Sequence, residues 1–327
     1  MTAAGLGLWA AITIAAAGPA TSPEYLPLQV AQAEGYFTQE GIEVALKVQP
    51  SENDAAQALA HGRADIAATS LDAAYRLGHV KGAPPLLVFG LTAAPPVAIL
   101  VSPHHKDSIQ SPAQLRGQPV GLPGVGTPEQ AMLATILSRA GVKIHQVPLR
   151  TFSNRLLAGA LQQGEVAAAV MADPWVTRLS EERTAFILVD LRSRSDAARW
   201  LGAETVHAAL FVREERRPDD RELAALARAL LRAVARVTEA PAESLAAVLP
   251  SSVTGQAGDF AVRLAGARQI YLPRGKVTED MLTASLAQAR ERSALPAAVK
   301  LPWWRWSPLL LQGPLEGATG AAPAERR

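Results

Sequence analysis

Short apolar runs alternate with amphipathic stretches along most of the chain. Apolar runs of about four to eight residues bounded by turn residues are typical of buried strands, whereas apolar residues recurring every three or four positions indicate helices. This pattern predicts strands at 11–16, 42–48, 65–68, 86–91, 97–102, 119–122, 142–147 and 167–171. It predicts helices at 25–34, 51–61, 71–77, 112–117, 128–140, 154–163, 219–237, 242–249 and 278–293, and one that begins at Asp173. Strands and helices that alternate in this way predict an α/β fold with parallel strands covered on both faces.

The stretch from Leu115 to Gln130 joins an apolar strand to a glycine-rich turn and then to a helix with a strong start signal. Gly124 and Gly126 lie in the turn, and Thr127 opens a Thr-Pro-x-Gln pattern. That pattern is typical of an N-cap, a first-turn proline and a capping box. Glycines beside a helix N-terminus let an oxyanion approach the backbone N–H groups, although an ordinary strand-to-helix turn remains the alternative.

Two short patterns recur about a hundred positions apart. A unit of Ala-Leu, a glycine three residues after the leucine and then an apolar run begins at Ala58 and again at Ala160. The dipeptides Gly-Ile at 41–42 and Gly-Val at 141–142 form a second pair. These echoes predict two similar α/β lobes.

Composition narrows the classes of function. A chain of 327 residues with 49% hydrophobic residues can form two domains with sizeable cores. The formal net charge is +2 and no basic cluster is interleaved with aromatic residues, so nucleic acid is not a predicted partner. The absence of cysteine excludes disulfides, thiolate nucleophiles and zinc–cysteine sites. No stretch reaches the roughly 20 apolar residues of a spanning helix, so no transmembrane segment is expected.

The N-terminal region has two interpretations. Residues 6–17 are apolar, and the three alanines at 15–17 resemble the small residues of a signal-peptide cleavage site. No Lys or Arg precedes Lys47, however, so the positive region of a secretory signal is missing. The run 11–15 fits a buried first strand equally well.

Three further segments agree in order and spacing with a known family. They are Pro-Leu-x-x-Ala with Gly-Tyr-Phe-x-x-Glu-Gly-Ile-x-Val over 27–44, the Ala-Leu unit over 58–70, and Ser-Pro-x-x-Leu-x-Gly-x-x-Val-Gly over 111–121. Over residues 10 to 295 the chain resembles the substrate-binding proteins of ABC transporters of the nitrate, sulfonate, taurine and thiamine-precursor group. That family has a strand about two dozen residues ahead of Gly-Tyr-Phe, which favours the strand interpretation of the N-terminal run.

The resemblance implies a two-lobe periplasmic-binding-protein fold of type II. Each lobe would be a mostly parallel sheet flanked by helices, and the chain would cross twice between lobes, at 97–102 and at 208–213. Lobe one would comprise residues 10–98 plus 209–310, and lobe two residues 99–208. The tail 313–327 is rich in Gly, Ala and Pro and is predicted to be disordered.

The resemblance also implies a function without catalysis or a cofactor. A small organic or oxyanionic solute would be captured in the cleft between the lobes by hinge closure and passed to an ABC permease and ATPase. The protein would be a monomer in the periplasm or another extracytoplasmic space. The alternative is a cytoplasmic enzyme or ligand sensor of the same fold, of the thiamine-pyrimidine or menaquinone-pathway type; the thiamine-pyrimidine enzymes carry a cysteine-rich segment that this chain lacks.

Loops at the carboxyl ends of the predicted strands should face the cleft. The candidate ligand-binding residues in these loops are Thr21, Ser22, Ser51, Asn53, Thr69, Ser70, Gly124, Gly126, Thr127, Asn154, Asp173 and Trp175. Hydroxyls and amides at helix N-termini suit anions or oxygen-rich ligands. For the serines and for Asn154, N-capping alone is the alternative.

Asp173-Pro174-Trp175 follows a predicted strand and carries the one acidic candidate. Asp173 would pair with a ligand amine and Trp175 would form a pocket wall or stack on a ring, and with Asp173 free in the cleft a purely anionic ligand such as nitrate is not expected. We favour the alternative, in which Asp173 is an N-cap, Pro174 the first helical residue and Trp175 a core residue.

Two other clusters are not assigned to the site. His104 and His105 lack a paired carboxylate motif, so they are interpreted as solvated and no metal site is predicted. Trp303, Trp304 and Trp306 are interpreted as a packing anchor, with a permease contact as the alternative.

Overall fold

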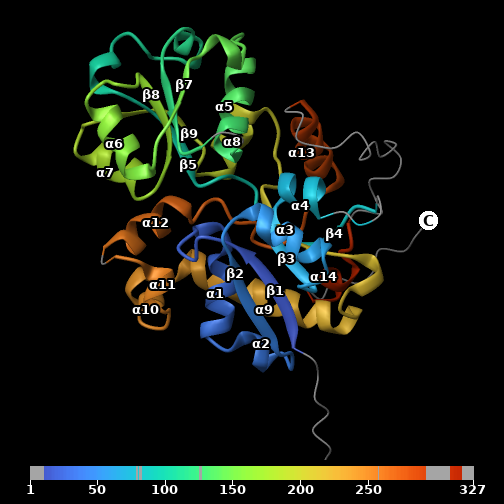
Figure 1. Ribbon diagram of the computed structural model, residues 1–327. Helices are drawn as coiled ribbons and strands as arrows, with labels where there is room; N and C mark the ends of the chain where they lie inside the picture. The colour runs from blue at the N-terminus through green and yellow to red at the C-terminus, as the bar shows by residue number, and fades with distance from the viewer. Residues whose placement is uncertain are drawn as a thin grey trace, which may run out of the picture.

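The computed structural model describes residues 11–78, 80, 83–124, 127–256, 258–291 and 310–318. Two five-stranded sheets form two lobes. In Figure 1 the first lobe is mainly blue and orange, and the second lobe is green. The first sheet has the order β2-β1-β3-β10-β4, made of β2 (Val44–Gln49), β1 (Ile12–Ala17), β3 (Ile66–Ser70), β10 (Ala208–Val212) and β4 (Leu86–Thr92). The second has the order β7-β6-β8-β5-β9, made of β7 (Leu149–Thr151), β6 (Val120–Leu122), β8 (Ala168–Ala172), β5 (Val97–Val101) and β9 (Phe186–Asp190).

Each sheet is mixed in the same way. Three neighbouring strands are parallel, and the fourth, β10 in the first sheet and β5 in the second, is antiparallel to both of its neighbours. Each antiparallel strand is the first strand that the chain forms after crossing from the other lobe. The predicted crossing segments 97–102 and 208–213 are therefore strands within the sheets, and the crossings lie ahead of them, between β4 and β5 and between α8 (Arg194–Leu201) and β10. The predicted lobe boundaries at 98/99 and 208/209 stay a proposal. Val97 and Ala98 pair within the second sheet, and Ala208 pairs within the first.

Helices cover both faces of the first sheet because alternate residues of its buried strands point to opposite sides. Ile66 and Ala68 of β3 belong to a cluster with α1 (Leu26–Ala33) and α9 (Asp220–Glu239), whereas Ala67 packs with α3 (Glu52–Ala60), α4 (Leu71–Leu77) and α13 (Glu279–Glu291). The second sheet is covered in the same manner, by α5 (Pro128–Arg139) and α8 on one face and by α6 (Asn154–Gln162) and α7 (Trp175–Glu181) on the other.

The sequence repeat corresponds to the same turn in both lobes. After α3, the Arg63 N–H donates to the Ala58 carbonyl at 2.9 Å, and after α6 the Glu165 N–H donates to the Ala160 carbonyl at 2.9 Å. Gly62 and Gly164 end the two helices with φ values of 66° and 76°, a left-handed conformation that glycine adopts without a steric penalty. The repeated unit is therefore a helix, a left-handed turn and the central strand that follows it.

Some predicted elements differ from the structure. The strand predicted at 142–147 is wrong, because residues 144–146 form a 3-10 turn and the strand is β7 at 149–151. Strand β9 and helices α8 and α12 (Asp259–Ala267) were not predicted. The remaining helices are α2 (Tyr36–Gln39), α10 (Ala242–Ala246), α11 (Ser251–Thr254) and α14 (Gly313–Ala318).

The C-terminal tail also differs from the prediction of disorder. Residues 313–318 form α14, which packs on α9 with Leu315 only 3% exposed. Residues 319–327 and the cluster of Trp303, Trp304 and Trp306 lie outside the described residues. Within the described ranges, no helix has the length and apolar character needed to cross a membrane.

Candidate functional site

A cavity of about 1020 Å³ lies between the two lobes and is lined by both. The first lobe contributes the loops that follow β1, β2 and β3. The second lobe contributes the first turns of α5 and the segment after β8, and Pro95 and Pro96 of the first crossing close one side. The carboxyl ends of parallel strands meet at such an edge, so the placement of the cavity follows from the sheet topology.

Eight of the twelve candidate residues line this cavity. They are Thr21, Ser22, Ser51, Asn53, Ser70, Thr127, Asp173 and Trp175. Thr69 does not: its side chain is fully buried and its Oγ1 donates to the Glu52 carbonyl at 2.9 Å. Gly124 lies outside the lining, Asn154 is the first residue of α6, and Gly126 is outside the described residues.

The three hydroxyls at helix starts act as N-caps. Ser51 Oγ accepts from the Asp54 N–H at 3.2 Å, Ser70 Oγ from the Ala73 N–H at 3.3 Å, and Thr127 Oγ1 from the Gln130 N–H at 3.4 Å. Each cap satisfies one of the N–H groups that a helix start leaves without an intrahelical partner. The capping role of these residues is confirmed, and their ligand-binding role stays a proposal.

Asp173 is not a free carboxylate. Its side chain is only 4% exposed, Oδ2 lies 2.8 Å from Nη1 of Arg192, and Oδ1 accepts from the Thr177 N–H at 2.9 Å. Asp173 therefore caps the first turn of α7, as the favoured interpretation has it, although the helix begins at Trp175 with Pro174 before it. A pairing of Asp173 with a ligand amine does not fit this arrangement, because Arg192 already neutralises the carboxylate. Trp175 packs partly buried against the α6–α7 side of the second sheet.

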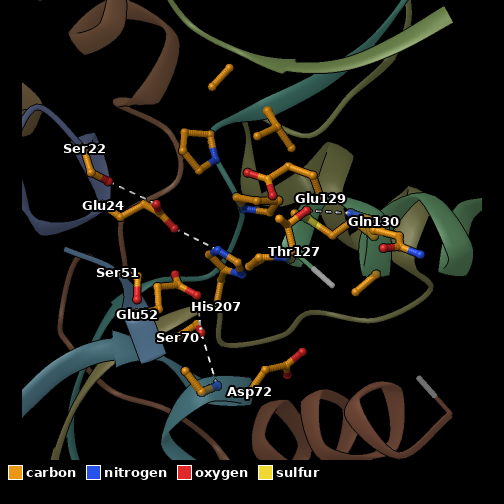
Figure 2. Close-up of a pocket in the computed structure, with 18 of the residues that line it drawn as sticks. Ser22, Glu24, Ser51, Glu52, Ser70, Asp72, Thr127, Glu129, Gln130 and His207 are labelled. Atoms are coloured by element: carbon orange, nitrogen blue, oxygen red, sulfur yellow. Dashed lines mark hydrogen bonds and ion pairs between the residues drawn. The ribbon is translucent and has the colours of Figure 1, made fainter. Parts of the chain in front are cut away.

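The most charged part of the lining was not among the candidates. Figure 2 shows Glu24, Glu52 and His207 converging on the first-lobe side of the cavity. Glu24 follows β1 in a 3-10 turn (Pro23–Tyr25), Glu52 is the first residue of α3, and His207 immediately precedes β10. These positions lie far apart in sequence and meet only because their strands are neighbours in one sheet.

An ion pair and three hydrogen bonds hold these side chains in place. His207 Nε2 lies 2.8 Å from Glu24 Oε1, an ion pair without the direction of a good hydrogen bond. The other oxygen of Glu24 accepts from Ser22 Oγ at 3.1 Å. Glu52 accepts from Ser70 Oγ at 2.6 Å and from the Tyr25 hydroxyl at 3.2 Å. The cluster is thus oriented by neighbouring donors before any ligand arrives.

Burial and the neighbouring charges change the acidity of the cluster. Burial alone would lower the pKa of His207, but the carboxylates of Glu24 and Glu52 raise it to about 9. Burial, and after it the charge of Glu24, raise the pKa of Glu52 to about 7. At neutral pH the cluster therefore holds a charged imidazolium beside Glu24, and a second carboxyl group that gains or loses a proton easily.

These three side chains also form a possible cation site. Their ligand atoms, one imidazole nitrogen and two carboxylate oxygens, lie within 4.8 Å of one another. Two carboxylates and one histidine are a donor set that zinc accepts, with a fourth position open to the cavity. His207 and Glu24 already form an ion pair with each other, so a metal ion would have to displace the imidazole proton before it could bind.

Glu129 faces the cluster from the second lobe. It is the second residue of α5, where a carboxylate is stabilised by the helix dipole, and it projects into the cavity across from His207 in Figure 2. Within the part of the chain that the structure describes, it forms no hydrogen bond or ion pair. The sequence could have indicated Glu24, Glu52 and Glu129, because each follows a predicted strand and lies within two residues of a hydroxyl that was a candidate ligand-binding group.

Two mixed five-stranded sheets joined by two crossings, with a cavity at the strand ends, define the periplasmic-binding-protein fold. The chain belongs to the NMT1/THI5-like family, whose model matches residues 22–244. A protein from Bordetella bronchiseptica RB50 has a similar structure, with a TM-score of 0.73 and 23% identity over 97% of this chain and 99% of the other.

Binding proteins with known names share the fold at lower identity. The periplasmic aliphatic sulphonate binding protein SsuA from Escherichia coli has a TM-score of 0.72 and 19% identity over 97% of this chain and 96% of its own. The periplasmic nitrate-binding protein NrtA from Synechocystis PCC 6803 has a TM-score of 0.64 and 12% identity, covering 96% and 89%. Comparison with curated proteins finds no sequence match to the chain.

Proposed function

We propose that the protein is the solute-binding component of an ABC importer, which encloses a small solute between its lobes and presents the closed form to a permease. The observation that carries this proposal is the cavity of about 1020 Å³ lined by both lobes, because a ligand held there contacts both sheets at once. Such a ligand stabilises the closed arrangement by the difference in its affinity for the open and closed forms. Sulfonate- and nitrate-binding proteins with the same fold support the proposal.

The chemistry of the lining favours binding over catalysis. A nucleophilic serine needs a free hydroxyl beside a base. The Ser70 hydroxyl donates to Glu52 and accepts from the Ala73 N–H, and only 3% of the residue is exposed. For this binding function we propose an ABC permease and ATPase as partners. We also propose that the protein acts as a monomer in an extracytoplasmic location, and the alternative is an enzyme of the same fold.

The test measures closure directly. Because the chain has no cysteine, a pair of introduced cysteines accepts two fluorophores without background labelling. Glu182→Cys on the second lobe and Glu243→Cys on the first, both exposed, report the distance between lobes by energy transfer. The pair Lys47→Cys and Glu243→Cys, within the first lobe, is the matched control.

The probes are sulfonates, oxyanions, amines and pyrimidines, each added to the labelled protein. We expect at least one class to bind saturably, one molecule to one chain, with a change in energy transfer for the interlobe pair and none for the control pair. Turnover of a probe, or binding that leaves the interlobe signal unchanged, would contradict the proposal in favour of the enzyme.

A further inference from the structure

The lining of the cavity has more negative than positive side chains. Five carboxylates line it, Glu24, Glu52, Asp72, Glu129 and Asp173, against three cationic side chains, Arg76, His207 and Arg263. Asp173 is neutralised by Arg192 from behind the lining, and Arg263 donates to the carbonyls of Val253 and Thr254. Asp72 and Arg76 lie one turn apart on α4 and cancel formally. Glu24, Glu52 and Glu129 remain, against His207 and the guanidinium of Arg263 among the described lining residues, so the carboxylates still outnumber the cations.

These remaining charges lie on opposite lobes. Glu24, Glu52 and His207 belong to the first lobe, and Glu129 belongs to the second, across the cavity. The charge of Glu129 reaches the first lobe, since it contributes to the raised pKa of Glu52. Closing the lobes on an anion would gather like charges in a space from which water is leaving, where their repulsion grows.

A positive ligand reverses this effect, because each carboxylate then attracts it. The size of the cavity indicates which kind of cation fits: about 1020 Å³ holds a small organic molecule, whereas a bare metal ion fills a small part of it. The lining also offers apolar surface beside the carboxylates, from Pro95, Pro96, Met132 and Trp175. Such surface suits the carbon skeleton of an amine or amidine.

We infer that the solute is an organic cation, whose protonated nitrogen lies between Glu129 of the second lobe and the Glu24–Glu52–His207 cluster of the first. This inference rests on the proposed function and adds the charge of the solute to it. It sets this chain apart from its structural relatives that are named for binding sulphonate and nitrate, which are anions.

Three probes with one ring and different charge test the inference: benzamidinium, neutral benzamide and benzenesulfonate, measured by calorimetry and thermal shift. Propylammonium and propanesulfonate form a second matched pair. We expect the cations to bind at least tenfold more tightly than their neutral and anionic partners. Glu129→Gln should weaken benzamidinium at least tenfold and leave benzamide unchanged, and Glu129→Asp should restore most of the preference. Glu181→Gln, an exposed acidic residue on the same lobe, is the control and should change neither probe.

The outcomes separate this inference from the proposed function. Saturable binding of benzenesulfonate or nitrate with lobe closure, and none of the cations, would overturn the cationic solute and leave a solute-binding protein. A cation preference that survives in Glu129→Gln would overturn the assigned position. A response to Zn²⁺ alone, tested in the same assay, would replace the organic cation by a metal ion, and no response to any probe would contradict both proposals.

Discussion

The two lobes share a frame but contribute different chemistry to the cavity. In the first lobe, the loops after β1, β2 and β3 all reach the lining, and they bring Glu24 and Glu52. In the second lobe, the strand ends corresponding to β1 and β3 supply the start of α5 and Asp173, whereas the loop after β7, where α6 begins, stays outside. The acidic residue that follows β8 is paired with Arg192, and Glu129, which is half-buried, is the carboxylate that faces the first lobe.

This difference shows how a repeated fold acquires a directional site. The two turns of the repeat have equivalent hydrogen bonds, because a glycine with positive φ and the pairing of the following strand determine their local geometry. Side chains at the strand ends carry no such constraint, so the two lobes differ there. The first lobe thereby becomes the charged half of the cavity, and the second supplies a helix N-terminus and one opposing carboxylate.

The largest expected effect comes from removing the cation that neutralises Asp173. Arg192 contacts Oδ2 of Asp173 and Oδ2 of Asp190, both at 2.8 Å, and its loss leaves the buried Asp173 carboxylate without a counter-charge. Arg192→Met should therefore lower the free energy of unfolding by about 3–5 kcal/mol, measured by urea denaturation. The second lobe would then resemble the first, because it too would carry a carboxylate at the cavity without an arginine partner.

A compensating variant distinguishes the ion pair from packing. In Arg192→Met with Asp173→Asn, the buried group is neutral, so a substantial part of the lost stability should return. Arg155→Met, at an exposed arginine on the same lobe, should stay within about 0.5 kcal/mol of the parent. Equal losses in the single and double variants would show that the contact with Asp173 is not the cause.

The charged cluster of the first lobe should make stability depend on pH. The pKa of His207 is raised to about 9 and that of Glu52 to about 7, so the folded protein holds both protons more tightly than the unfolded chain. The stabilisation is fully present below the unfolded values and is lost as pH rises through about 7 and then 9. We expect the free energy of unfolding to fall by about 3 kcal/mol between pH 7 and 9.5.

The histidine portion of this loss can be isolated by substitution. His207 faces Glu24, Glu52 and Asp72, and His207→Gln removes the group that titrates near pH 9 while retaining a polar side chain. The fall between pH 7 and 9.5 should then be smaller in the variant than in the parent. A parallel pair of pH profiles would mean that the imidazolium is not stabilised by these carboxylates in the folded state.

Local signals in the sequence were sufficient for much of the fold. The helix predicted at 71–77 is α4 with the same bounds, and the N-caps Ser51 and Thr127 lie where the patterns indicate, because capping depends on residues within one turn. The segment 142–147 was wrong because pairing with β6 decides its structure, and β6 pairs with Leu149 to Thr151. Register is a tertiary property that an apolar run does not specify.

The site was predictable in outline and less so in its chemistry. Strand ends located the cavity and eight of the twelve candidates, since sheet topology decides which loops meet. Glu24 and His207 are far apart in the sequence, with three strands of the first sheet and the whole second lobe between them, so no local pattern contains their contact. Arg192 neutralises Asp173 through a similar tertiary contact, which is why the one acidic candidate was the one least available to a ligand.

The smallest expected effect compares equivalent helix starts in the two lobes. Ser51 precedes α3 and caps it through Oγ, whereas Ser153 precedes α6 and its side chain makes no capping hydrogen bond. Ser51→Ala should lower the free energy of unfolding by about 1 kcal/mol, while Ser153→Ala should change it by less than about 0.3 kcal/mol. Both measurements come from the same urea denaturation series. Equal losses at the two positions would mean that the lobes cap these helices alike, and that their difference lies only in the side chains at the cavity.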